Sequence, residues 1–475
     1  MQPADRERRV VIVGVLIAML LAAVDQASVA PAIAIIGADL GNSPFLSWVV
    51  SVYFVTATAV TTLYGKIADV HGRRVTLFGA IATFLVGSLI STTAPSLELL
   101  ILGRAIQGLG GGGLLVLAQT VIGDVVPPAE RGRYAAYISG AWAVASIAGP
   151  VLGGAIAEHV HWRAIFLLNM PLGFLAMAIC WGPLKRLPWT KREHRLDVLG
   201  SVLVVSATVM AMLALTWSGP RHGWRAPDTL GLLAACALVT GWFIVHVRRA
   251  AEPLIPLSVL SNRTVAAATI GGFFVMAAYT GLAVFLPIYL QLVLGLSPSN
   301  AGLALIAYMA GAVIGSWIAG RALTRLTRYK LAAVAGLAAA VIALVLMTAW
   351  SGRMPLATFE ALLLLAGAGL GANFPVTTVS VQNAVESHNL GAATGVLQFL
   401  RSLGSAIGIA VLGAAAAVFG IATGITARTP GAGGGPLSAA ATGAAFAPLF
   451  ALVAAGALIA LCCIMMIENK PLRGR

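Results

Sequence analysis

The sequence predicts an all-α polytopic membrane protein with about 14 transmembrane helices. Apolar residues make up 59% of the 475 residues and charged residues only 10%, whereas about a quarter of the residues of a soluble domain are charged. Long apolar runs recur along the chain, and a bilayer core about 30 Å thick takes roughly 20 such residues as a helix. The runs lack the alternation of apolar and polar residues that membrane-barrel strands require, so helices are expected.

The apolar runs form three groups along the chain. Six runs come first, two follow, and six more complete the sequence. Their approximate bounds are 10–37, 46–65, 75–94, 98–121, 134–157 and 164–182, then 197–216 and 229–247, then 264–294, 301–322, 331–350, 356–380, 390–419 and 445–467. Each run is long enough to cross a bilayer as a helix.

Basic polar stretches separate the three groups. Pro183–Arg195 ends the first group, and Arg248–Arg263 precedes the last. We therefore expect an N-terminal six-helix bundle with its cytoplasmic loop over residues 1–195, two inserted transmembrane helices over 196–250, and a C-terminal six-helix bundle over 251–475.

The net charge of +14 is distributed as a membrane topology signal rather than as a nucleic-acid-binding surface. An even number of spans returns both termini to one side. Most basic residues fall on that side, in Arg6–Arg9, Lys66–Arg74, Arg131, Arg133, Lys185–Arg195, Arg248–Arg263, Arg321–Lys330 and Lys470–Arg475. The other side holds Arg163, Arg221, Arg225, Arg353 and Arg428. The positive-inside rule predicts cytoplasmic termini in an inner (plasma) membrane, with no nucleic-acid partner.

Cysteine and histidine predict neither a cofactor nor a metal site. The four cysteines lie within or at the ends of apolar runs and lack the spacing of a disulfide or metal site. His159 and His161 could hold a metal, but a polar loop is the favoured interpretation. A nucleotide-binding loop of the Gly-x-x-x-x-Gly-Lys-Ser/Thr type does not occur in the sequence, so ATP is not the expected energy source.

A basic segment with two glycines joins the second and third runs. It reads Gly65-Lys-Ile-Ala-Asp69-Val-His-Gly72-Arg73-Arg74. Glycine permits a tight turn, and the Asp69 carboxylate can face a helix N-terminus or a neighbouring arginine. Such a contact would lock two halves of the molecule together on the cytoplasmic side. A generic charged turn is the alternative.

Two further segments combine small residues with chemically distinctive ones. The fourth run contains Leu102-Gly103-Arg104-Ala-Ile-Gln107-Gly108, and the fifth contains Ala148-Gly149-Pro150-Val-Leu-Gly153-Gly154. Small residues allow helices to approach closely, and the proline ring removes a backbone donor. We therefore expect a bend in the fifth helix about which a bundle can rock. A tight packing face with no role in transport is the alternative.

These three segments resemble motifs of the major facilitator superfamily: its signature loop, its buried-arginine motif and the motif of its antiporters. Other segments resemble the family's fourteen-helix drug/proton antiporters, namely Trp162-Arg163, Phe166, Asn169, Pro171, Gly173, Asp197–Gly200, Glu252–Leu257, Phe285–Gln291 and Gly391–Arg401. The sequence departs from that branch in the first run. Asp25-Gln26-Ala27 stands where the branch has Asp-x-Thr, and Pro31 lies closer to the aspartate than the branch's proline.

Asp25 and Arg104 are the ionisable pair expected to carry proton coupling. At about 1.5 Å per residue, Asp25 lies roughly 22–24 Å into the first span, and Arg104 lies roughly 9 Å below the outer surface in the fourth. The two depths overlap, so we expect the side chains to be neighbours. Such a carboxylate can bind and release protons, with the arginine opposing the effect of desolvation. Glu158, near the outer surface, is the next candidate.

Substrate contacts are expected in both bundles. Arg401 should lie near the midplane, where it either attracts an anionic group or organises the C-terminal bundle through backbone carbonyls and Gln398. The predicted cavity-lining residues are Trp142, Phe285, Tyr289 and Asn373, with Trp48, Tyr53, Phe273, Phe274, Tyr279 and Phe374 as further candidates. One carboxylate among aromatic walls suits a lipophilic cation.

The resemblance implies a bilayer-embedded monomer that exchanges protons for a small lipophilic substrate. The expected function is proton-coupled export of lipophilic or cationic drug-like compounds by alternating access between the bundles. A lipid or glycolipid exporter of the same fold is the alternative. A membrane receptor or channel is disfavoured because the motifs concern bundles that rock. We do not expect an enzyme.

Overall fold

The computed structural model describes residues 3–41, 45–125, 131–186, 197–217, 226–250, 253, 260–325, 330–385, 390–419, 421 and 439–468. The regular structure of these residues is entirely helical. Twelve helices among them are long and apolar enough to cross a membrane. Two others, α2 and α5, lie where the second and fifth runs are predicted. The all-helical, fourteen-span expectation therefore agrees with the structure.

The N-terminal group of helices follows the predicted order. Its members are α1 Pro3–Leu40, α2 Trp48–His71, α3 Arg73–Thr93, α4 Leu97–Val125, α5 Arg131–His159, α6 Arg163–Leu167, α7 Asn169–Trp181 and a short 3₁₀ turn at Pro183–Arg186. α4 packs against α2 and α3, while α1 packs against α5 and α7. Four successive glycines, Gly110–Gly113, let α4 meet both α2 and α3 at close range.

The remaining helices form an inserted pair and a C-terminal group. The pair is α8 Val198–Trp217 and α9 Pro227–Arg249. The C-terminal group comprises α11 Arg263–Leu292, α12 Pro298–Arg325, α13 Lys330–Ala349, α14 Leu356–Gly371, α15 Asn373–Ala384, α16 Leu390–Val418 and α18 Ala439–Met465. In this group α11 packs against α16 and α18, and α12 packs against α14.

Two predicted single spans each contain a one-residue break in helical hydrogen bonding, at Leu168 in the sixth run and at Ala372 in the twelfth. Both residues keep right-handed helical backbone angles, so each span continues through its break. A proline stands three residues after each break, and its missing N–H cannot bond the carbonyl four residues earlier. In the second case the carbonyl freed by Pro375 is that of Gly371, which accepts a hydrogen bond from Ser316 Oγ of α12 at 2.7 Å. Tertiary contact therefore satisfies the carbonyl that the proline leaves free.

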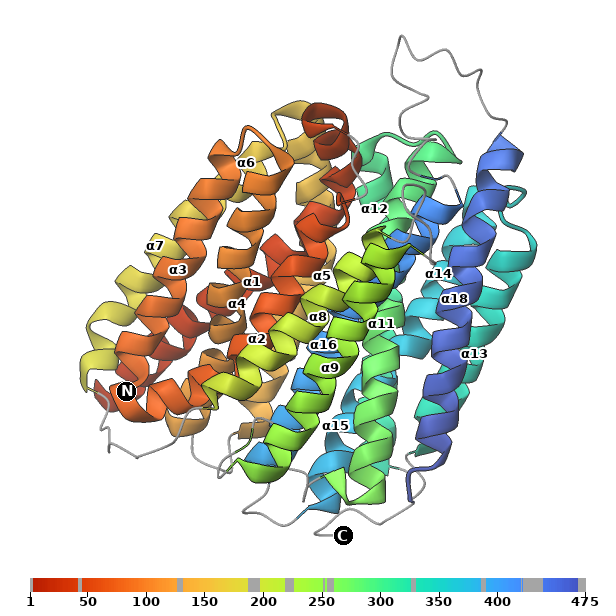
Figure 1. Cartoon of the computed structure of the whole chain (residues 1–475). Coiled ribbons are helices and arrows are strands. Elements are labelled where there is room, and N and C mark those ends of the chain that lie inside the picture. Colours follow the sequence, from red (N-terminus) through yellow and green to blue (C-terminus); the bar gives the residue numbers. More distant parts are fainter. Residues whose placement is uncertain are drawn as a thin grey trace.

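The two bundles lie side by side and touch at one end. In Figure 1, α1 begins and α18 ends at the lower end, which we call the terminal side; the opposite end is the far side. Contacts between the bundles run from α5 to α12, from α2 to α16 and from α1 to α11. The helices converge toward the far side and spread toward the terminal side (Figure 1).

The inserted pair lies across the front of the molecule (Figure 1). α8 contacts α2 of one bundle and α16 of the other, while α9 packs against α8. His246 Nε2 of α9 lies 2.6 Å from Asp197 Oδ1, and the same carboxylate oxygen accepts a hydrogen bond from the Gly200 backbone at the start of α8. Asp197 thus caps α8 and joins it to α9.

Candidate functional site

Asp25 and Arg104 form an ion pair in the interior of the N-terminal bundle. The Arg104 guanidinium donates to Asp25 Oδ2 at 2.5 Å, and both side chains are 0% exposed. α1 carries the aspartate and α4 the arginine, at the overlapping depths that the rise per residue predicts. The expected neighbours therefore do meet, and each charge compensates the other where water is absent.

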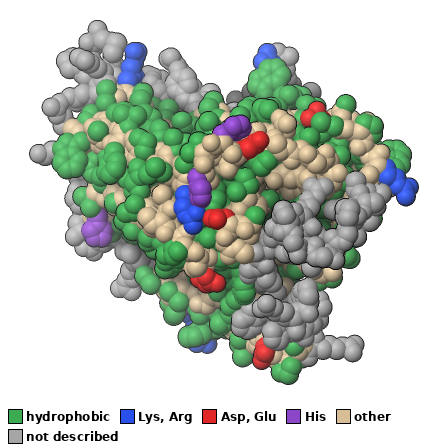
Figure 2. Space-filling model, turned by 90° about the horizontal axis from the view of Figure 1, so that it is seen from above, with side chains coloured by type: hydrophobic (Ala, Val, Ile, Leu, Met, Phe, Trp, Pro, Cys, Tyr) green, Lys and Arg blue, Asp and Glu red, His purple; other side chains and the backbone are tan. Residues whose placement is uncertain are grey.

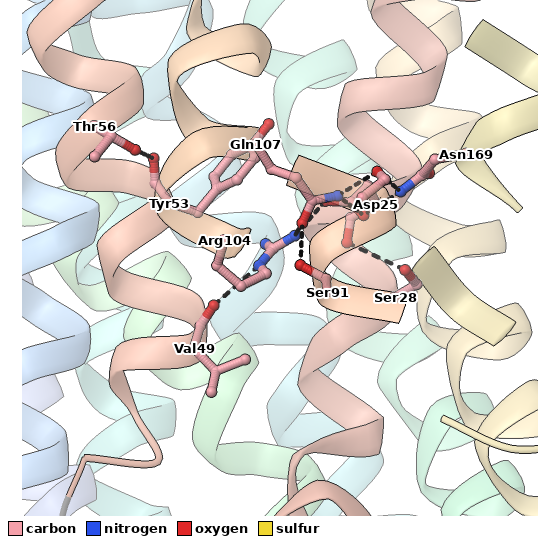
Figure 3. A network of polar contacts seen from close by, with 10 residues as sticks. Asp25, Ser28, Val49, Tyr53, Thr56, Ser91, Arg104, Gln107 and Asn169 are labelled. Carbon is pink, nitrogen blue, oxygen red and sulfur yellow. Dashed lines mark hydrogen bonds and ion pairs between the residues drawn. The ribbon is translucent and has the colours of Figure 1, made fainter. Parts of the chain in front are cut away.

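Two amides complete the coordination of the Asp25 carboxylate (Figure 3). Asn169 Nδ2 of α7 donates to Asp25 Oδ1 at 2.7 Å, and Gln107 Nε2 of α4 donates to the same oxygen at 3.2 Å. Both amides also donate to Ser88 Oγ of α3, at 3.0 and 2.6 Å. The carboxylate therefore receives three donors, from Arg104, Gln107 and Asn169.

Sequence reasoning assigned no site role to Gln107, Asn169 or Ser88. Gln107 could have been found, because it lies one helical turn after Arg104 and its Oε1 accepts from the Arg104 guanidinium at 2.8 Å. Asn169 stands at the start of α7, directly after the break at Leu168. Its contact with Asp25 depends on the rotation of α7 about its axis, which the apolar pattern does not give.

The rest of the Arg104 side chain is enclosed by α2 and α6. Its Nε donates to the Val49 carbonyl at 3.0 Å, and the guanidinium carbon lies 4.7 Å from the centre of the Tyr53 ring and 5.7 Å from that of Phe166. These contacts are with neutral groups, so Asp25 supplies the countercharge. In this conformation both side chains are shielded from solvent.

The small residues of α5 divide between two neighbouring helices. A Cβ at Gly149 would meet Ala27 of α1, and one at Gly153 would overlap the Ser28 carbonyl of the same helix. A Cβ at Gly154, by contrast, would lie 2.5 Å from the carbonyl oxygen of Pro298 in α12. The segment therefore packs α5 within its own bundle and against the other bundle at the same time.

Pro150 takes part in the contact between the bundles. It lies inside α5, which remains one helix from Arg131 to His159. A Cβ at Gly302 of α12 would lie 2.5 Å from the Pro150 carbonyl oxygen. The structure thus shows the packing face that was the alternative to a hinge, and a bend at Pro150 remains a prediction.

Glu158 joins the bundles at the far side. Its Oε2 accepts a hydrogen bond from the backbone N–H of Ser299, in the first turn of α12, at 2.8 Å. Hydrogen bonding from Ser299 lowers the pKa of the Glu158 carboxyl below its usual value. Figure 2 shows this face, where a small group of acidic, basic and histidine side chains lies among apolar and uncharged ones. A carboxylate on a helix N-terminus is favourable because it meets unpaired N–H groups.

The segment between α2 and α3 is more helical than expected. α2 continues through Gly65 and Asp69 to His71, and Gly72 alone separates it from α3, with φ of 89°. Only glycine adopts this conformation without strain. The Asp69 side chain lies outside the described part of the chain, so its expected partner is untested. Arg74 stacks on Trp181 of α7, with its guanidinium carbon 4.5 Å from the ring centre.

The predicted substrate residues differ in their surroundings. Tyr289 belongs to an aromatic core, stacked on Phe359 with ring centres 4.7 Å apart and edge-on to Phe446 and Phe450. Phe285 is buried near the contact between α16 and the start of α2. The Trp142 side chain lies outside the described residues. Tyr289 and Phe285 therefore pack against protein in this conformation.

Asn373 and Arg401 lie on neighbouring helices of the C-terminal bundle. Asn373 Nδ2 donates to the Gly369 carbonyl at 3.0 Å across the α14–α15 break, and its buried Oδ1 has no partner among the described residues. Arg401 donates to the Phe374 carbonyl at 2.9 Å. The structure thus places both at the same break in the twelfth span.

Comparison with known sequences identifies a family. The sequence profile of the Major Facilitator Superfamily matches residues 15–409. Multidrug resistance protein 3 of Bacillus subtilis (strain 168) is 34% identical over 406 residues, covering 85% of this chain and 78% of that protein. Multidrug transporter protein MdtP of the same organism is 29% identical over 411 residues, covering 86% and 75%. An MFS-type transporter of Mycobacterium tuberculosis is 31% identical over 407 residues, but the match spans only 59% of its length.

Solved structures show the same fold at lower sequence identity. A bacterial homolog of the human lysosomal transporter Spinster, in an inward-facing and occupied conformation, superposes with a TM-score of 0.67 at 16% identity, over 97% of this chain and 96% of that one. A POT family peptide transporter superposes with a TM-score of 0.61 at 14% identity, over 97% and 98%. The arrangement of two packed bundles is thus shared with transporters.

Proposed function

The chain belongs to the Major Facilitator Superfamily, and from this premise we propose that it is a proton-coupled antiporter that exports lipophilic or cationic drug-like compounds. The similarity to multidrug transporters over most of the chain supports drug export. The buried Asp25–Arg104 pair carries the proposal of proton coupling, because an ionisable carboxylate in the interior of a membrane bundle is functional by default.

We place the terminal side in the cytoplasm and the far side outside an inner (plasma) membrane. The loops expected on the terminal side hold most of the basic residues, which supports this orientation. The transporting unit is proposed to be one chain, with an N-terminal bundle over residues 1–195, an inserted pair over 196–250 and a C-terminal bundle over 251–475. The helix contacts are compatible with these limits, since α8 and α9 pack mainly on each other.

Alternating access would be a rocking of one bundle against the other. The described contacts between bundles involve the far-side ends of α5 and α12, where Gly154 meets Pro298 and Glu158 meets Ser299. The conformation is therefore closed at the far side. To release a compound outward, these contacts must separate while contacts on the terminal side form.

Asp25 would couple this movement to a proton. The carboxylate holds together α1, α4 and α7 through Arg104, Gln107 and Asn169. Protonation turns an acceptor of three hydrogen bonds into a neutral group and weakens the bond to the guanidinium most, since that bond joins two charges. The N-terminal bundle would then repack, and release of the proton to the cytoplasm would restore the pair.

The test is ethidium transport by everted membrane vesicles, in which export from the cell becomes uptake into the vesicle. Vesicles that contain the protein should accumulate ethidium when a proton gradient is present and lose it when an uncoupler is added. Vesicles without the protein provide the baseline. Uptake that is insensitive to the uncoupler would exclude proton coupling, and no uptake above the baseline would exclude ethidium-type drugs as substrates.

A further inference from the structure

The C-terminal bundle holds a cation whose charge the described residues leave uncompensated. Arg401 lies eleven residues after Leu390, the first residue of α16, and therefore about 16 Å along a helix that crosses the membrane. Its side chain passes between α11 and α15, where Gly272 of α11 leaves space: a Cβ there would lie 3.5 Å from Arg401 Cγ and 3.6 Å from Nε. Arg401 is thus at membrane depth, inside the bundle.

Neutral oxygen atoms hold the guanidinium of Arg401. Its Nη2 donates to the Phe374 carbonyl at 2.9 Å, to Thr377 Oγ1 at 2.5 Å and to Thr378 Oγ1 at 3.2 Å. Both threonine hydroxyls donate their own protons to carbonyls of α15, so they present lone pairs to the arginine. Within the described chain Arg401 has no carboxylate partner, and its Nε makes no hydrogen bond.

The contrast with Arg104 is one of net charge. Arg104 shares its interior with Asp25, so the N-terminal network is neutral overall. The three acceptors of Arg401 carry dipoles and no charge, so the described residues leave one positive charge at a depth where an unpaired cation is unfavourable. A purely structural link between α15 and α16 does not require that charge, because a neutral donor would serve the same oxygens.

Further polar and aromatic groups lie on α15 or pack against it. Asn373 and Ser380, both 1% exposed, lie one turn to either side of Thr377 on α15, and Asn373 Oδ1 and Ser380 Oγ are buried without partners in the described structure. The Phe374 ring lies beside the guanidinium, with its centre 5.9 Å from Cζ, and Tyr279 packs edge-on against Phe374. A flat apolar ligand could contact these rings while its polar end reaches Arg401.

We propose that Arg401, with Thr377, Thr378 and Phe374, forms a binding subsite for an anionic group on an aromatic, lipophilic substrate, such as a carboxylate or a sulfonate. The planar guanidinium suits such groups because it can offer parallel N–H donors. Asp25 is saturated by three donors and fully buried, so it does not offer a corresponding site to a cation in this conformation. The inference rests on the proposed function, since it names a substrate class for the same exporter.

Two fluorescent probes that differ only in a sulfonate test the subsite. These are 8-anilino-1-naphthalenesulfonate, which is anionic, and N-phenyl-1-naphthylamine, which is neutral. Binding of each is measured to the full-length protein in nanodiscs, with the signal of empty nanodiscs subtracted. R401Q removes the charge, and R401K keeps the charge but lacks the planar guanidinium with its parallel N–H donors. R321Q, at the exposed end of α12, is the matched control.

R401Q should weaken binding of the sulfonate about tenfold, since a charge-assisted hydrogen bond is lost, and change binding of the neutral probe less than twofold. The affinity of R401K for the sulfonate should lie between those of R401Q and the wild type. R401K therefore still tests the subsite if R401Q does not fold. R321Q should match the wild type for both probes. Equal weakening of both probes, an unchanged sulfonate affinity, or no sulfonate binding to the wild type would overturn the subsite. Ethidium transport in everted vesicles judges the proposed function separately.

Discussion

Asn169 Nδ2 donates a hydrogen bond to Asp25 Oδ1 at 2.7 Å, and this contact joins α7 to α1 beside the ion pair with Arg104. The same amide reaches Ser88 of α3 at 3.0 Å. A single carboxylate is therefore held by donors from two other helices and is linked through Ser88 to a third. The carboxylate thus connects four helices of the N-terminal bundle, α1, α3, α4 and α7.

Asp25→Asn should abolish transport driven by the proton gradient while leaving substrate binding. Asparagine resembles the protonated carboxyl in shape and charge, so the site is fixed in one state and can no longer exchange a proton. Ethidium uptake into everted vesicles and ethidium binding to purified protein measure the two effects. Glu98→Gln is the control, because Glu98 is an exposed acid at the start of α4. Uphill uptake by Asp25→Asn would place the coupling site elsewhere.

Arg104→Ala should shift the pH profile of transport to higher pH and destabilise the protein. Without the guanidinium, the buried carboxylate has no countercharge and takes up a proton more readily. Removing one partner of a buried ion pair costs about 3–5 kcal/mol, so thermal unfolding should occur at a lower temperature. Arg104→Lys should lie between Arg104→Ala and the wild type in both its pH profile and its unfolding temperature. An unchanged pH profile in a folded Arg104→Ala protein would separate the arginine from the proton step.

Gly153→Leu and Gly154→Leu should fail in different ways although the residues are adjacent. A side chain at Gly153 overlaps the Ser28 carbonyl within the N-terminal bundle, so this variant should unfold at a lower temperature. A side chain at Gly154 meets Pro298 of the other bundle. This variant should therefore unfold at a temperature closer to that of the wild type than Gly153→Leu does, and its transport rate should fall. Thermal unfolding and transport rates distinguish the two. Identical behaviour would contradict the division of α5 between two neighbours.

Pro150→Ala tests the hinge that the sequence predicts. If the missing backbone donor allows α5 to bend during transport, restoring it should slow turnover and leave substrate affinity unchanged. Transport rates at saturating ethidium and equilibrium binding measure these quantities. Weaker binding with unaltered turnover would mean that Pro150 shapes the substrate site and does not serve as a hinge.

The contact between Glu158 and Ser299 should stabilise the protein above about pH 4.5 and fade in acid. Hydrogen bonding from Ser299 lowers the pKa of Glu158 from its usual 4.5. A lowered pKa means that the ionised group stabilises the closed far side, and this stabilisation is lost as the pH falls through the lowered value. Thermal unfolding of wild type and Glu158→Gln should therefore differ near pH 7 and converge in acid. His159 and His161, the nearby titratable groups, are present in both proteins.

The sequence predicted the helices because a bilayer requires long apolar runs, and it predicted the Asp25–Arg104 contact because helix rise converts residue number into depth. Depth does not give the rotation of a helix about its axis. Tyr289 therefore looked like a cavity residue although it stacks on Phe359 in the core. The contact of Asn169 with Asp25 likewise depends on the rotation of α7, which the sequence does not give.

The partners of carbonyls freed by proline lie beyond what the apolar pattern can show. Pro375 is visible in the sequence, but the residue that satisfies the freed Gly371 carbonyl is not. Ser316 does so for Gly371 from a helix more than fifty positions earlier. Arg401 could likewise be placed at a depth, but its contacts with Phe374 and Thr377 depend on the rotation of α15 and α16 about their axes.

The position of α8 determines where the seam between the bundles can open to lipid. α8 packs on α2 and on α16, the pair of helices that meets along one flank of the seam. On that flank a lipid tail would first have to displace a transmembrane helix. The opposite flank, where α5 and α12 meet through Gly154 and Pro298, has no such cover among the contacts described. Opening the seam to the bilayer on the α2–α16 flank would therefore require α8 to move as well.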